Sequence, residues 1–148
     1  MPQIELLDET SQYPHAERLT RVLGALLAEL GAVERELTLV LMDDATIERH
    51  NREDRGEDGP TDVLSYPTAE PGDLGFPQVP HLGDVLISLD TAARQAPQHG
   101  HTLHEEVLVL AAHGVTHLRG YDHQEDADWE PFLAAQQRVL QLERELAP

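Results

Sequence analysis

Cysteine is absent from this chain of 148 residues, and lysine is absent too, because all 10 basic residues are arginine. Without cysteine there is no disulfide framework and no thiolate metal site, so any bound metal must be held by histidine and carboxylate groups. Basic residues of any kind are few: 28 acidic residues outnumber them and give a net charge of −18. That balance argues against a protein that coats nucleic acid through a broad positive surface.

Long apolar runs are also missing. No stretch of about 18 apolar residues occurs, and the N-terminus lacks the basic and apolar segments of a signal peptide. We therefore expect a cytoplasmic protein with no contact to membranes. The length suits one unit with its own core, so residues 1–148 are expected to form a single domain.

Hydrophobic periodicity predicts strands that alternate with helices but do not form clean β-α-β repeats. The expected class is therefore α+β, with a small mixed β-sheet packed against helices. Thr102 is expected to cap a central helix, with Glu105 as its capping-box partner. The expected strands are residues 2–8, 36–42, 61–66 and a run from 83; the other expected helices are 15–30, 43 or 44 to about 51, 89–96, and 126 or 128 to about 145.

The central helix carries the most informative stretch, residues 112–123, which reads A-H-G-V-T-H-L-R-G-Y-D-H. His113 and His117 are four residues apart, so on a helix both imidazoles project from one face. Gly120 can end the helix, and His123 follows from the turn beyond it. Three imidazoles suit one tetrahedral Zn²⁺ with its fourth position open, which is typical of a catalytic site. The alternative is a set of surface or helix-capping histidines.

The spacing of these histidines is that of metzincin-like metal sites. A peptidase with this motif carries a glutamate after the first histidine as its general base, but Gly114 stands there. The metal site is therefore predicted without the base that peptide hydrolysis needs. His99, His101 and His104 are a candidate second metal site, although solvated loop and helix-start histidines are the expected interpretation.

Three blocks of sequence carry a resemblance to a known family. They are residues 51–67, with N-R-E-D-R-G and G-P-T-D-V-L-S-Y-P; residues 82–88, L-G-D-V-L-I-S; and residues 113–123. In this order and spacing they resemble the YbeY family of bacterial endoribonucleases. The family pattern has an aromatic residue where this chain has Asp54, and lysines where it has Glu57 and Gly59, so the loop is less basic here.

The resemblance implies cleavage of single-stranded RNA in 16S ribosomal RNA 3′-end maturation and ribosome quality control, with the small ribosomal subunit and its factors as partners. It implies one zinc ion on His113, His117 and His123. Arg55 and His113 are expected to be catalytic, and Arg55 and Arg119 to bind substrate, since guanidinium groups suit phosphate. Asp62 and Asp84 are candidates to support the site.

Two alternatives stay open. One is a metal-dependent hydrolase of another substrate, a peptidase included. The other is a ribosome-associated binding protein whose zinc only supports the fold.

Overall fold

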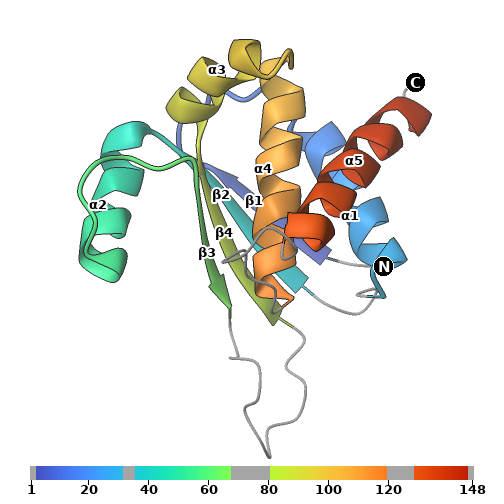
Figure 1. Cartoon of the computed structure of the whole chain (residues 1–148), viewed down its shortest axis with the longest axis horizontal. Helices are drawn as coiled ribbons and strands as arrows, with labels where there is room; N and C mark the ends of the chain where they lie inside the picture. The colour runs from blue at the N-terminus through green and yellow to red at the C-terminus, as the bar shows by residue number, and fades with distance from the viewer. Residues whose placement is uncertain (1–2, 32–35, 68–80, 120–128, 147–148) are drawn as a thin grey trace, which may run out of the picture.

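The computed structural model of the chain describes residues 3–31, 36–67, 81–119 and 129–146. Along these residues the strands and helices follow one another in the order that the sequence predicted: they alternate at first, and then two strands and three helices come in succession (Figure 1). The elements are β1 (Gln3–Asp8), α1 (Ala16–Glu29), β2 (Glu36–Met42), α2 (Asp44–Arg55), β3 (Val63–Pro67), β4 (His81–Ser88), α3 (Leu89–Gln98), α4 (Leu103–Leu118) and α5 (Glu130–Glu145).

The strands form one mixed sheet in the order β1-β2-β4-β3. β1, β2 and β4 are parallel, and β3 is an edge strand antiparallel to β4. Strand β3 therefore ends where β4 begins, with Pro67 opposite Gly83. These features confirm the predicted α+β class with a small mixed sheet.

Helices cover both faces of this sheet (Figure 1). The larger core lies between the sheet and helices α1 and α4, with α5 packed outside them. Helix α2 covers the other face through a small cluster of Met42, Ile47, Leu64 and Leu86. Each fully buried leucine or isoleucine stabilises the fold by about 1.5–3 kcal/mol. The two cores hold α2 and α4 on opposite sides of edge strand β3, which places residues from both helices near that strand.

The predicted helix boundaries were accurate for α1 and α4 and less so for α2. Thr102 and Glu105 form the expected capping box at the start of α4. Helix α2 runs to Arg55, four residues beyond the predicted end at Asn51, and stops at Gly56, whose φ of 68° glycine adopts without strain. Arg55 is thus held by the last helical turn rather than by a loop.

Helix α5 begins at Glu130, with Pro131 in its first turn. The two predicted starts of this helix, Asp126 and Asp128, lie outside the described residues. Helix α3 continues two residues past the predicted end at Ala96 and includes Pro97 in its last turn. No helix in the described part of the chain is long and apolar enough to cross a membrane.

A polar network joins the start of α1 and α4 to the end of α5. Arg18 donates to Glu143 Oε1 at 2.6 Å, and His104 Nε2 lies 3.1 Å from Glu143 Oε2. Tyr13 Oη donates to His104 Nδ1, so His104 was wrongly grouped with the loop histidines. Burial lowers the pKa of His104 and outweighs the nearby carboxylate. Burial also opposes ionisation of Glu143, but hydrogen bonds from Arg18 and His104 lower the pKa of this carboxyl group.

This network makes the fold sensitive to acid. Both pKa values are lower in the folded chain than the ordinary 6.5 for histidine and 4.5 for glutamate, so the unfolded chain binds more protons and stability rises with pH. The free energy of unfolding should therefore fall as the pH drops below 6.5 and again below 4.5. Urea unfolding in EDTA at several pH values measures this. Glu143→Gln should flatten the dependence below pH 4.5 but not the one below pH 6.5, because burial keeps the pKa of His104 low without the carboxylate. A slope below pH 4.5 equal to that of wild type would contradict the assignment.

Candidate metal centre and its surroundings

Helix α4 brings two of the three predicted ligands together. The capping box fixes the start of the helix, and the 3.6-residue period then places His113 and His117 on one face, one turn apart. Their Nε2 atoms are 3.2 Å apart, and their ring centroids 4.8 Å. Both side chains are only partly buried, so the pair is open to solvent on one side. His123, the third predicted ligand, lies outside the described residues.

The distance between the two nitrogen atoms fits a shared metal ion. Two ligand atoms bonded at about 2.0–2.1 Å to a tetrahedral zinc ion lie about 3.3 Å apart. The 3.2 Å between the Nε2 atoms of His113 and His117 is close to this value. Neutral imidazole is also a ligand type that zinc prefers. The residues present therefore fit a zinc ion, and an N–H···N hydrogen bond is the alternative at this distance.

Two aromatic side chains from the start of α5 lie beside the histidines. Phe132 is fully buried, with its ring centroid 4.7 Å from that of His113 and 4.8 Å from that of His117. The ring centroid of Trp129 lies 6.1 Å from that of His113, and the Trp129 residue is 37% exposed. These rings restrict the imidazole orientations from the apolar side. The sequence analysis missed both residues, because nothing in a single aromatic residue indicates which helix it will face.

Gly114 lets α4 approach the sheet closely. A Cβ atom at this position would lie 2.6 Å from Val85 Cγ1 and 3.1 Å from Ser65 Oγ, so any side chain would push the helix away. Ser65 Oγ donates to the Gly114 carbonyl oxygen at 3.3 Å, which ties β3 to the helix next to His113. The position of the peptidase base therefore faces the sheet and has no room for a glutamate. This argues against the peptidase alternative.

Arg55 is attached to the same edge strand from the α2 side. Its Nη2 donates to the Ser65 carbonyl oxygen at 2.8 Å, and its guanidinium carbon lies 5.7 Å from the Tyr66 ring centroid. Ser65 therefore links Arg55 to Gly114, the neighbour of His113. Because a guanidinium group has five N–H donors, one bond to Ser65 leaves others for a phosphate. Arg55 is exposed at the surface, as a substrate contact must be.

A second hydrogen bond supports the ring beneath Arg55. Tyr66 Oη donates to Asp54 Oδ2 at 2.7 Å. Burial, the hydrogen bond and the charge of Asp54 raise the pKa of Tyr66 to about 12, so the phenol stays protonated at neutral pH. Tyr66 therefore cannot serve as a base there. It orients Arg55 through its ring while its hydroxyl group holds Asp54.

Comparison with known proteins covers nearly the whole chain. The sequence model of the family described as Endoribonuclease YbeY matches residues 3–143. The chain belongs to the endoribonuclease YbeY family. The Endoribonuclease YbeY of Thermus thermophilus is 54% identical over 125 residues, which cover 84% of this chain and 88% of that protein. The one from Moorella thermoacetica is 43% identical over 145 residues, 90% of this chain and 92% of that protein.

A solved structure has the same fold. The solution structure of TM1509 from Thermotoga maritima matches with a TM-score of 0.70 and 25% sequence identity, covering 97% of this chain and 90% of that chain. The described residues of the three sequence blocks meet around edge strand β3. Gly83 from the second block has a φ of 146°, and a Cβ there would lie 2.3 Å from the Tyr66 carbonyl oxygen and 2.9 Å from Leu118 Cδ2. Glycines in two blocks thus allow all three to pack together.

The remaining predicted site residues lie in different parts of the fold. Arg119 follows α4 directly and is exposed, two residues after His117. Asp84 is on β4 opposite Tyr66. Asp62 is at the opposite end of β3 from Pro67, where its carboxylate accepts from Val63 N at 2.8 Å and Gln95 Nε2 at 3.3 Å. These bonds are those of a strand-start cap.

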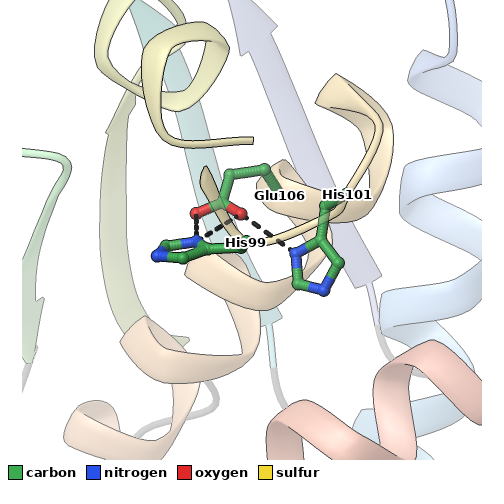
Figure 2. Close-up of side chains that lie close together, drawn as sticks. All are labelled: His99, His101 and Glu106. Carbon is green, nitrogen blue, oxygen red and sulfur yellow. Dashed lines mark hydrogen bonds and ion pairs between the residues drawn. The ribbon is translucent and has the colours of Figure 1, made fainter. Parts of the chain in front are cut away.

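A second group of possible metal ligands lies at the start of α4 (Figure 2). His99 Nδ1 is 3.0 Å from both carboxylate oxygens of Glu106, and His101 Nδ1 is 3.1 Å from one of them. Gly100, with a φ of 71°, turns the chain so that both rings face the same carboxylate. Glu106 is 1% exposed, so its charge needs such partners. The sequence analysis expected solvated histidines here and missed Glu106.

Proposed function

We propose that this YbeY family member is a zinc-dependent endoribonuclease that cleaves single-stranded regions of 16S ribosomal RNA precursors during 3′-end maturation and ribosome quality control. The observation that carries this proposal is the 3.2 Å approach of His113 and His117 beside a strand that also holds Arg55. The substrate implies action in the cytoplasm, on the small ribosomal subunit and its associated factors. We further propose that residues 1–148 form one domain.

The proposed zinc ligands are His113, His117 and His123. When bound, a zinc ion polarises a phosphoryl oxygen and lowers the pKa of a water molecule to near neutrality. Each histidine must be neutral to serve as a ligand. Phe132 packs against His113 and His117, so these two rings are held in place before any ion or substrate arrives. His113 directly precedes Gly114, whose carbonyl oxygen accepts from Ser65 on β3, the residue that also binds Arg55.

Arg55 is proposed to bind the phosphate that is cleaved. The bond to Ser65 and the contact with Tyr66 fix the guanidinium group at the edge of β3. A donor fixed in this way stabilises negative charge as it develops on the phosphate oxygens, with little reorganisation. Arg119, on the turn after His117, is proposed as a second phosphate contact. Asp84 is proposed to support the site from β4.

Metal content and cleavage measured on the same preparation test the proposal. Protein purified without added metal should contain about one equivalent of zinc. It should cleave a single-stranded RNA, lose this activity in EDTA and regain it when zinc is restored. The same assay on casein should show no hydrolysis. Full RNA cleavage in EDTA by metal-free protein would reject the zinc-dependent mechanism.

A further inference from the structure

An exposed aromatic ring lies beside the proposed metal ligands. Three large hydrophobic side chains are exposed among the described residues, and two of them, Trp129 and Leu133, lie four residues apart at the start of α5. Trp129 is 37% exposed, with its ring centroid 6.1 Å from that of His113. Phe132 is fully buried and packs against both Trp129 and the histidines. Trp129 thus combines these ring contacts with surface that is accessible to solvent.

The acidic net charge of the chain favours RNA contacts that do not depend on charge, such as those of an exposed aromatic ring. With a net charge of −18 and no lysine, the body of the protein repels a polyanion. Glu130, next to Trp129, is exposed as well, so this part of the surface does not attract phosphate groups. Affinity for RNA must then come partly from contacts that do not depend on charge. Stacking of a base on an aromatic side chain is such a contact, and all four bases can make it.

We propose that Trp129 is a binding site for an unpaired RNA base adjacent to the cleaved phosphodiester. This inference rests on the proposed function. In a duplex both faces of a base are already stacked, whereas an unpaired base can turn out and lie on an aromatic ring. Trp129 therefore selects single-stranded substrate and places its backbone next to His113. In this arrangement Arg55 binds the phosphate and Trp129 binds the base.

The chain offers a direct test, because Trp129 is its only tryptophan. A single-stranded 2′-O-methyl oligonucleotide, which resists cleavage through the 2′-hydroxyl group, should quench the intrinsic fluorescence of the protein saturably. A duplex of the same sequence should not. Anisotropy of a labelled oligonucleotide then gives the affinity of each variant. Trp129→Leu should weaken binding by about 5- to 150-fold, and Trp129→Phe should retain most of it.

Leu133→Ala is the matched control, since it removes exposed apolar surface that has no aromatic face. It should bind as wild type does. Equal losses in Leu133→Ala and Trp129→Leu would overturn base stacking in favour of a general apolar contact, such as one for a protein partner. Wild type that cleaves RNA without quenching would reject the inference and leave the proposed function intact. Quenching without cleavage would reject the proposed function and leave a base-binding site. Melting temperatures verify that each variant is folded.

Discussion

Replacing His117 with alanine should reduce RNA cleavage to below about a hundredth of the wild-type rate. Loss of even an outer partner of a metal ligand costs about 10- to 100-fold, and His117 is a proposed direct ligand. The variant should also lose its zinc, because two remaining imidazoles hold an ion less well than three. The side chain is only partly buried on α4, so the melting temperature of the metal-free protein should change little. Single-turnover cleavage and elemental analysis give the two results.

The matched control is His99→Ala, which removes a histidine from the second donor group. His99 is 51% exposed, and without it His101 still pairs with the buried carboxylate of Glu106, so we expect α4 to stay folded with some loss of stability. This variant should retain both zinc and activity. If His99→Ala loses the metal and His117→Ala keeps it, the functional ion is bound by His99, His101 and Glu106 instead. Unchanged cleavage by zinc-free His117→Ala would mean that the metal is structural.

The proximity of His113 and His117 in the proposed metal centre was predictable, because it depends only on the helical period. Two histidines four residues apart on a capped helix must share a face, whatever the rest of the fold does. The role of Gly114 was only partly predictable from the sequence. Its presence excluded a glutamate base, but the reason is the close contact with Val85 and Ser65, which comes from sheet packing. The sheet class also followed from local patterns, whereas its strand order did not.

Features that depend on distant contacts were not predictable from the sequence. The polar run Glu53–Arg55 has no apolar periodicity, so the last turn of α2 was predicted as a loop. The hydrogen bond between Asp54 and Tyr66 joins residues 12 apart and depends on where β3 lies. Likewise, Glu106 is an ordinary surface residue by sequence, and only burial in the fold makes its histidine partners necessary. In each case the structure is decided by packing between separate helices and strands, which the local sequence does not reveal.

Substitution of Arg55 separates an effect on the rate of cleavage from an effect on RNA binding. The acidic body supplies little general affinity for RNA, so a few charges near the metal must bind the phosphate. Arg55 has the required geometry, because Ser65 and Tyr66 hold the guanidinium group at 2.8 Å and 5.7 Å. A donor oriented before the reaction acts mainly on the transition state, where the oxygens gain charge. Its loss should therefore lower the rate of cleavage more than it weakens binding.

Arg55→Ala should slow single-turnover cleavage of a single-stranded RNA by about 10²- to 10³-fold with zinc still bound. Arg55→Lys keeps the charge but cannot bond Ser65, lie over Tyr66 and bind two phosphate oxygens together, so it should recover only part of the rate. Arg49, exposed on the same helix, is the matched control, and Arg49→Ala should cleave as wild type does. If Arg55→Ala also cleaves at the wild-type rate, the bond to Ser65 only joins helix α2 to strand β3, and another group must stabilise the phosphate.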